Sequence, residues 1–130
     1  MLEYSTKLPQ FQEILDFLKI SDNEFDKPLS SKLDLEAYAH KLWENSTVVT
    51  CRDEGRIVGM INCYTNRPSR GFISNVCVLS PYHGQGVFTK LFSMLCRYCW
   101  TCGIEEILLE VNKSNERAFQ TYVNTGFKTY

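Results

Sequence analysis

The feature that most constrains the fold is a strand that runs through a glycine loop into a helix. The strand covers residues 72–79, which are dense in Ile and Val, and Pro81 ends it. The loop HGQG occupies residues 83–86, and apolar residues then recur at helical spacing over 88–102, with Gly103 placed to end the helix. Glycines leave the backbone N–H groups of such a loop unobstructed, and the helix dipole makes the first turn positive. The stretch therefore predicts a cradle for an anion.

The residues around Lys90 exclude two well-known phosphate-binding loops. A P-loop carries a glycine directly before its lysine, and Thr89 occupies that place here. The dinucleotide motif GxGxxG also fails, because the same Thr89 stands where the third glycine belongs. The glycine loop must therefore serve another ligand or have only a steric role.

The remaining segments predict helices on either side of a strand meander. Apolar spacing indicates a helix over residues 9–19 and a second one from an N-cap at Asp34 to about Asn45. Strands follow at 48–52 and 56–64 around the turn Asp53-Glu54-Gly55, and a second turn occupies residues 65–71. A further strand is predicted at 104–111. The last helix is marked by Ala118, Phe119, Tyr122 and Val123, and it is closed by Gly126 before a short strand opens at Phe127. This order indicates an α/β (α+β) fold with a mixed sheet, in one domain of residues 1–130.

Composition narrows the class of protein and of partner. Apolar residues make up 44% and charged residues 22%, as in globular proteins, and the net charge of −1 lacks the basic excess typical of nucleic-acid binding. No apolar run approaches the roughly 18 residues that span a membrane, and MLEYSTKLPQFQ has no apolar signal core. We expect a cytoplasmic protein with neither nucleic acid nor membrane as its partner.

The cysteines do not predict a metal site. Three of the six, Cys96, Cys99 and Cys102, are spaced three residues apart on the predicted helix. Each step of three turns the side chain by about −60°, which spreads the sulfurs around the helix. The only histidines are His40 and His83, and no second pair of ligands completes a tetrahedral site. We expect free thiols that pack as small apolar side chains, in a reducing compartment, and no metal.

Two motifs resemble the GCN5-related N-acetyltransferase (GNAT) superfamily. Its loop motif is (Gln/Arg)-x-x-Gly-x-(Gly/Ala), and residues 83–88 read HGQGVF. The family's downstream motif is L-x-V-x-x-x-N-x-x-A-x-x-x-Y-x-x-x-G-F, and it matches in register at Leu109, Val111, Asn115, Ala118, Tyr122, Gly126 and Phe127. The resemblance covers residues 46–130, and the first 45 match only in having two helices. It implies a GNAT-like, mostly antiparallel mixed sheet whose C-terminal strand hairpin is shortened.

Two positions depart from the family pattern. His83 stands in place of Arg or Gln, and Phe88 replaces a small residue in the first turn of the helix. Backbone amides do not depend on side-chain identity, so a diphosphate cradle survives both changes. The bulk of Phe88 must then turn into the core and away from the cofactor.

The resemblance implies acetyl-CoA as co-substrate and gives roles to individual residues. Main-chain groups of Val76, Cys77 and Val78 would pair with the pantetheine arm, and Asn115 would hydrogen-bond the cofactor. Tyr122 would protonate the leaving thiolate. Amides from Gly84 to Phe88 would hold the diphosphate. The remaining cofactor-binding residues are those of the loop: His83, Gly84, Gln85, Gly86, Val87 and Phe88.

Several alternatives stay open at this stage. Asn115 could cap its helix, Tyr122 could be a core residue on an apolar stripe, and His83 could be only a turn residue. Family members often place a glutamate base on the strand before the loop, where this chain has Ser74 and Asn75, which leaves Glu110 or a water chain. We expect an acetyltransferase acting on an amine by direct attack, or else a non-catalytic acyl-CoA-binding module or a plain interaction domain. The acceptor could be an amino sugar, a small amine, a protein N-terminus or a lysine, and a homodimer is open.

Overall fold

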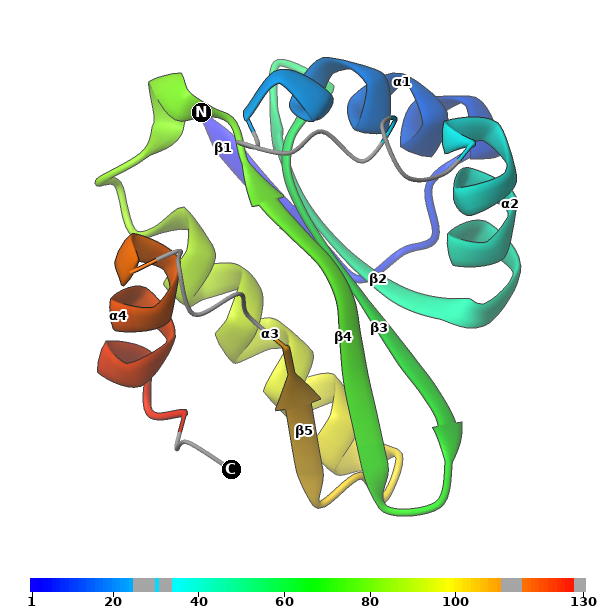
Figure 1. Ribbon diagram of the computed structural model, residues 1–130, viewed down its shortest axis with the longest axis vertical. Coiled ribbons are helices and arrows are strands. Elements are labelled where there is room, and N and C mark those ends of the chain that lie inside the picture. Colours follow the sequence, from blue (N-terminus) through cyan, green and yellow to red (C-terminus); the bar gives the residue numbers. More distant parts are fainter. Residues whose placement is uncertain (25–29, 31–33, 111–115, 128–130) are drawn as a thin grey trace.

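Five strands form one mixed sheet in the order β1-β2-β3-β4-β5 (Figure 1). The computed structural model describes residues 1–24, 30, 34–110 and 116–127. The strands are β1 (Leu2–Ser5), β2 (Ser46–Asp53), β3 (Arg56–Arg67), β4 (Arg70–Val78) and β5 (Glu106–Leu109). Neighbours from β1 to β4 pair antiparallel, and β4 pairs with β5 in parallel. The predicted fold class, a mixed and mostly antiparallel sheet with flanking helices, is confirmed.

Helices cover both faces of this sheet (Figure 1). On the α1/α2 face, α1 (Phe11–Ser21) and α2 (Leu35–Asn45) bury Ile14, Leu18, Ala39 and Leu42 against Val48 and Met60. On the α3 face, α3 (Val87–Thr101) buries Leu91, Leu95 and Cys99 against Val49, Ile61 and Ile73. The last helix, α4 (Glu116–Thr125), lies beside α3 on the β5 side of the sheet. Alternate residues of β2, β3 and β4 thus enter two separate cores, as period-two strands require.

Strands β4 and β5 separate after a short pairing. Their register runs only from Arg70 opposite Glu106 to Ile73 opposite Leu109. Residues 74–78 of β4 have no strand partner on that side among the described residues, and α4 lies across from them (Figure 1). We call residues 74–78 the open edge of β4. It begins at a bulge, because the adjacent β3 residues Asn62 and Cys63 pair with Asn75 and Ile73, which leaves Ser74 as the extra residue.

Several boundaries differ from the sequence prediction. The sequence patterns do not predict strand β1 at all, and α1 begins at Phe11, two residues later than expected, after a capping box between Gln10 and Glu13. The predicted turn at 65–71 is much shorter, because β3 continues to Arg67 and β4 starts at Arg70. The positive φ of 64° at Ser69 lets the chain reverse within this short connection.

The C-terminal elements need further corrections. Strand β5 is shorter than the predicted 104–111, and Val111 lies outside the described residues. Phe127 is not in a strand, and the rest of the predicted final strand is outside the described part. Two residues expected on apolar helix faces are exposed, namely Cys102 at the end of α3 and Val123 on α4.

The cysteines are free thiols, as predicted, and four of the six are buried. Within the described ranges, no three His, Cys, Asp or Glu side chains are grouped so that they could hold a metal ion. Every helix within the same ranges is too short or too polar to cross a membrane.

Candidate active site

The open edge of β4 leads directly into the glycine loop. A one-turn 3-10 helix, η3 (Ser80–Tyr82), follows β4, and the amide of Leu79 donates to the carbonyl of Val58 at 2.9 Å. The Tyr82 hydroxyl donates to the carboxylate of Asp53 at the end of β2. These two bonds fasten the start of the loop to the neighbouring strands.

The glycines give the loop its shape and leave it open. Gly84 and Gly86 have φ values of 78° and 75°, in the left-handed region that favours glycine. A Cβ atom placed on either would meet no atom of the described residues within 4 Å, so these residues leave the space in front of the loop clear. Gly86 is the N-cap residue of α3 and has no side chain that could accept from the amides of the first turn.

The first turn of α3 presents unused amides. The helical ladder begins when the Lys90 amide donates to the Gly86 carbonyl at 3.1 Å. The amides of Val87, Phe88 and Thr89 precede this bond and have no carbonyl one turn earlier in the helix. They point out of the positive end of a 15-residue helix beside an open loop, which is the arrangement that favours an anion.

His83 is positioned to hold the loop on the strand. Its Nε2 atom lies 2.6 Å from the carbonyl oxygen of Val78, the last residue of β4. The imidazole is exposed, and the His83 backbone amide donates to the Ser80 carbonyl at 3.1 Å. This geometry favours the turn role for His83, and it gives the Val78 carbonyl a partner within the protein.

The two apolar residues after Gly86 turn inward. The Val87 side chain is buried in the α3-face core. The Phe88 ring stacks on that of Phe92, with centroids 6.0 Å apart and planes inclined by 10°. The Phe88 ring therefore turns away from the space in front of the loop, and only the Phe88 backbone amide faces that space, as an anion cradle requires.

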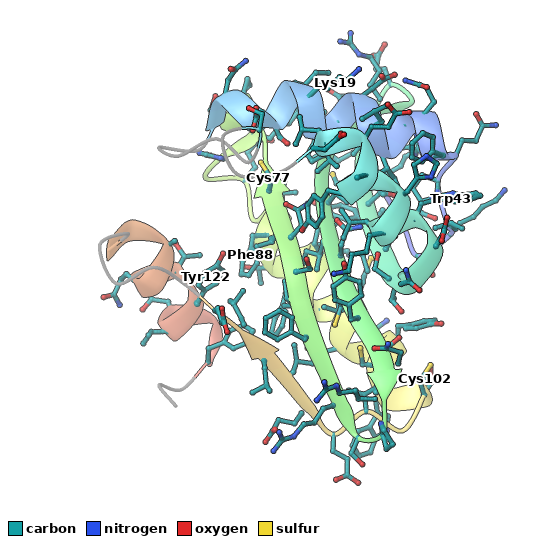
Figure 2. All side chains as sticks on the ribbon, turned by 45° about the vertical axis from the view of Figure 1, so that its right-hand side comes forward. Lys19, Trp43, Cys77, Phe88, Cys102 and Tyr122 are labelled. Atoms are coloured by element: carbon teal, nitrogen blue, oxygen red, sulfur yellow. The ribbon has the colours of Figure 1, made fainter. Side chains whose placement is uncertain are left out.

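Tyr122 projects from α4 toward the same place. Its ring centroid is 5.5 Å from that of Phe88 and 6.0 Å from that of Phe127. Figure 2 shows Phe88 and Tyr122 next to each other, on the side of β4 away from α1 and α2. Burial raises the pKa of the Tyr122 hydroxyl above 10.0, and the thiol of Cys77 on the open edge raises it further. Tyr122 is thus a half-buried phenol that stays protonated, within electrostatic reach of the open edge.

The positions where a base was expected hold a hydroxyl side chain, Ser74, and an amide side chain, Asn75, and both are already hydrogen-bonded. The Ser74 hydroxyl lies 2.7 Å from the Tyr38 hydroxyl, which also donates to the Ser74 carbonyl at 3.1 Å. The Asn75 amide donates to Asn62 Oδ1 at 3.1 Å. Burial raises the pKa of Tyr38, so its phenol is protonated at neutral pH.

Sequence reasoning misses Tyr38, although a signal is present. It lies four residues after the N-cap Asp34, in the apolar row of α2 that faces the sheet. A tyrosine in such a row must find a partner for its hydroxyl, and the bulge at Ser74 supplies it. Glu110, the other candidate base, is exposed beyond the end of β5, and Asn115 lies outside the described residues.

Two hollows of the molecule lie away from the glycine loop. One of about 610 Å³ lies where β3 and β4 meet α2, and one of about 450 Å³ lies between α3 and β5. Neither is lined by the loop or by Tyr122. The candidate site is made by a strand edge, a loop and a helix end.

Comparison with known proteins assigns the family. The model of the acetyltransferase (GNAT) family matches residues 12–127. N-alpha-acetyltransferase 30 of Schizosaccharomyces pombe is 28% identical over 123 residues, which cover 92% of this chain and 80% of that protein. N-alpha-acetyltransferase MAK3 of Arabidopsis thaliana is 28% identical over 113 residues, covering 85% of this chain and 58% of that protein.

Solved structures agree with the fold. A GNAT-family acetyltransferase from Staphylococcus aureus has a TM-score of 0.80 at 20% identity and covers 98% of this chain and 85% of its own. An aminoglycoside acetyltransferase, AAC(6')-Iy, in complex with a bisubstrate analog of CoA, has a TM-score of 0.75 at 14% identity and covers 99% and 92%. The chain therefore belongs to the acetyltransferase (GNAT) family. By class it is an acetyl-CoA-dependent N-acetyltransferase.

Proposed function

We propose that this protein transfers the acetyl group of acetyl-CoA to an amine by direct attack, with Tyr122 as the general acid. The observation that carries the proposal is the open edge of β4, which ends in the glycine loop and has the protonated phenol of Tyr122 nearby. A thioester bound along the edge would have its sulfur within reach of that phenol.

Each part of acetyl-CoA has a suitable group in this arrangement. Beyond Ile73, β4 pairs with no strand on its α4 side among the described residues, so main-chain groups of the stretch Val76, Cys77 and Val78 can pair with the amides of the pantetheine arm. The Val78 carbonyl is the exception, because it already lies 2.6 Å from His83 Nε2. The amides from Gly84 to Phe88 surround an open space at the positive end of α3, where the diphosphate fits. The role of Asn115 rests on the sequence motif alone.

The chemistry needs one proton donor and one proton acceptor. The amine nitrogen attacks the thioester carbonyl carbon, the C–S bond breaks, and the sulfur takes the proton of Tyr122 while the nitrogen loses a proton to water, which returns one to Tyr122. An amine with a pKa of about 10.4 must first lose its extra proton, which costs about 4 to 5 kcal/mol at pH 7. Ser74 and Asn75 cannot remove it, so water is the acceptor.

The side chains at the start of the open edge favour a second candidate function. The positions of a strand-borne base hold Ser74 and Asn75, and both side chains are engaged in hydrogen bonds. A module that binds acyl-CoA without catalysis would keep the cradle and need no base. The two candidates differ in turnover and agree in cofactor binding.

Two measurements on the purified protein separate them. Isothermal titration calorimetry with acetyl-CoA tests the cradle, and thiol release from acetyl-CoA with a panel of amines tests the transfer. We expect binding in the micromolar range and thiol release that depends on the amine. Binding with no release for any amine would favour the non-catalytic module, and no interaction at millimolar acetyl-CoA would overturn both.

A further inference from the structure

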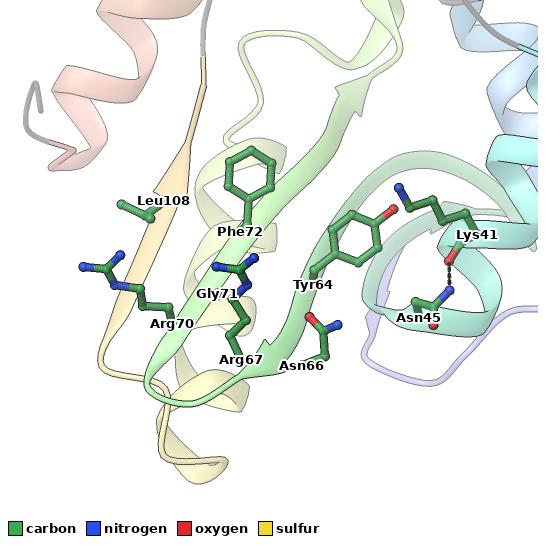
Figure 3. Close-up of a pocket in the computed structure, with 9 residues that line it drawn as sticks. All are labelled: Lys41, Asn45, Tyr64, Asn66, Arg67, Arg70, Gly71, Phe72 and Leu108. Atoms are coloured by element: carbon green, nitrogen blue, oxygen red, sulfur yellow. Dashed lines mark hydrogen bonds between the residues drawn. The ribbon is translucent and has the colours of Figure 1, made fainter.

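We propose that the hollow between α2 and the β3–β4 hairpin binds an anionic group of the acceptor, so that the preferred substrate is an amine carrying a carboxylate or phosphate. This inference rests on the proposed function and names the substrate class of its site. The hollow has a volume of about 610 Å³, and its lining includes Lys41, Tyr64, Arg67, Arg70, Phe72 and Leu108 (Figure 3).

The charges of the hollow have one sign. Three cations line it, and no Asp or Glu of the described residues does. Arg70 Nε is paired with Glu106 Oε1 at 3.0 Å, so its charge is largely neutralised. Lys41 and Arg67 have no ion pair within the described ranges and leave two uncompensated cations at the rim. A hollow of this kind attracts an anion and repels a polycation such as an aminoglycoside or a polyamine.

Tyr64 adds a hydrogen-bond donor at the same place. Its hydroxyl is buried and has no hydrogen-bond partner among the described residues. The Lys41 ammonium lies 5.6 Å from the centre of the Tyr64 ring, and Figure 3 shows the two side chains side by side. A buried hydroxyl without a partner is unfavourable, and an anion held by Lys41 would supply the missing acceptor.

Strand β4 connects the hollow with the candidate site. Tyr64 and Phe72 are cross-strand partners that line the hollow, and Ser74, which begins the open edge, is two residues further along β4. From Phe72 to Val76 is four residues, or about 13 Å of strand. An acceptor whose anion is held by Lys41 and Arg67 can therefore lay its amine on the open edge if the two groups are roughly 10 Å apart.

The apolar lining of the hollow favours an apolar segment between the amine and the anion of the acceptor. Phe72 is 38% exposed and, with Leu108, offers a surface for an aliphatic linker or a small side chain. Two sources of ligand share this chemistry: the N-terminus of a peptide with an acidic residue near its start, and a small ω-amino acid. Both present an amine and an anion joined by a linker that carries aliphatic groups, the methylenes of the amino acid or the small side chains of the peptide.

The experiment compares matched acceptors in a thiol-release assay. One arm uses Ala-Ala-Glu amide against Ala-Ala-Gln amide, and the other uses ω-aminocarboxylates of increasing length against their uncharged amides, with spermidine as a polycation. We expect the acidic member of each pair to have at least about tenfold higher kcat/KM, mainly through a lower KM, because a hydrogen bond to a charge in the hollow acts on binding. The arm with the larger ratio identifies the source of the ligand.

Variants of the two uncompensated cations test whether the hollow causes the preference for acidic acceptors. Arg67→Gln and Lys41→Gln should each reduce the acid preference, the ratio of kcat/KM for the acidic and the uncharged acceptor, by about tenfold. The control is Lys19→Gln, which removes a cation in the last turn of α1 that does not line the hollow and should keep the full preference. Raising the salt concentration should lower the preference in the wild type and have less effect in Arg67→Gln.

A binding measurement keeps this inference separate from the proposed function. Calorimetry with N-acetyl-Ala-Ala-Glu amide, which cannot be acetylated again, should show binding that Arg67→Gln weakens by about tenfold. Such binding without any turnover would support the anion site and overturn the proposed function. Turnover with equal efficiency on acidic and uncharged acceptors, or a preference for spermidine, would overturn the anion site and leave the proposed function standing. If neither binding nor turnover is observed, both the anion site and the proposed function are overturned.

Discussion

Burial keeps the Tyr122 hydroxyl protonated, so that it can act as a proton donor. The ring packs against Phe88 and Phe127, and its position inside the protein raises the pKa of the hydroxyl above 10.0. Tyr122→Phe removes the proton and keeps the ring packing. We expect kcat to fall by roughly 10² to 10⁴, with acetyl-CoA affinity nearly unchanged.

The control for this variant is Tyr98→Phe, which removes a hydroxyl from a tyrosine on α3 that is 39% exposed and absent from the candidate site. It should keep the wild-type rate. A rate for Tyr122→Phe within about threefold of wild type would rule out the acid role. The melting temperature must be measured on the same preparations, because loss of a buried hydroxyl alone costs about 1 kcal/mol.

The pH dependence follows from the same residue. The reaction needs a neutral amine and a protonated Tyr122, so kcat/KM should rise as the pH approaches the pKa of the acceptor amine. It should fall only above pH 10.0, since the pKa of Tyr122 is raised above that value. In Tyr122→Phe the fall at high pH should disappear while the rise remains. A fall well below pH 10.0 in the wild type would contradict the assignment.

Gly86 tests the loop at the level of one residue. Its φ of 75° strains any other side chain, and a Cβ there would enter the open space in front of the first turn of α3. Gly86→Ala should therefore lower stability by about 1 kcal/mol and weaken acetyl-CoA binding about tenfold or more, as measured by calorimetry.

A matched control exists in the turn between β2 and β3. Gly55 has a φ of 82°, and a methyl group added there would also meet no atom of the described part of the chain within 4 Å, but this glycine lies outside the candidate site. Gly55→Ala should lower stability by a similar amount and leave acetyl-CoA affinity unchanged. Equal affinity losses in the two variants would show that the effect is global and that the diphosphate is bound elsewhere.

At the scale of elements, local patterns predict most of the fold. The Asp34 cap, the glycine turn after Asp53 and the apolar row of α3 are all short-range signals, and the structure places the elements there. Strand β1 escapes prediction because its four residues contain too few alternations to show a period. Its register with residues 50–53 of β2 is set by a partner far along the chain. Sequence-local reasoning has no access to that partner.

The pair between Glu13 and Arg52 joins α1 to β2 and makes stability depend on pH. The hydrogen bond from Arg52 lowers the pKa of Glu13 below 4.5, although burial opposes this. A lowered pKa gives stability that is complete above the unfolded-state value and is lost as the pH falls through the folded-state value. We expect the free energy of unfolding from urea titrations to fall below pH 4.5 by more in the wild type than in Glu13→Gln.

Glu44→Gln serves as the control for that titration. Glu44 is exposed on α2 and has no ion pair among the described residues, so its loss should leave the acid limb of the stability curve unchanged. Because Glu13 is itself partly exposed, high salt should reduce the difference between wild type and Glu13→Gln. An identical acid limb in all three proteins would contradict the role of the pair.

At the scale of the whole molecule, the candidate site combines predictable and unpredictable parts. The glycine loop and Tyr122 follow from spacing and motif, because each lies within one element and its flanks. The link between Tyr38 and Ser74, and the cationic hollow around Lys41, join segments that are far apart in the sequence. They depend on how α2 crosses β3 and β4, which no local pattern specifies.

Acetyl-CoA should raise the melting temperature of the whole domain by mass action. A ligand that binds only the folded state at about a hundred times its Kd adds about 2.7 kcal/mol to the free energy of unfolding. Differential scanning fluorimetry with increasing acetyl-CoA should show a shift that grows with the logarithm of concentration. Gly86→Ala should need proportionally more ligand for the same shift, and an equal response in that variant would contradict the loop assignment.

The open edge of β4 also bears on how the protein behaves without ligand. A strand with an unpaired side can template the addition of a strand from another chain, which is a route to aggregation. Residues 74–78 offer such a side for only a short length, and the bulge at Ser74 interrupts the regular strand where that side begins. A ligand that pairs with this edge would act as a cap against self-association, so light scattering on warming should develop later with acetyl-CoA than without it.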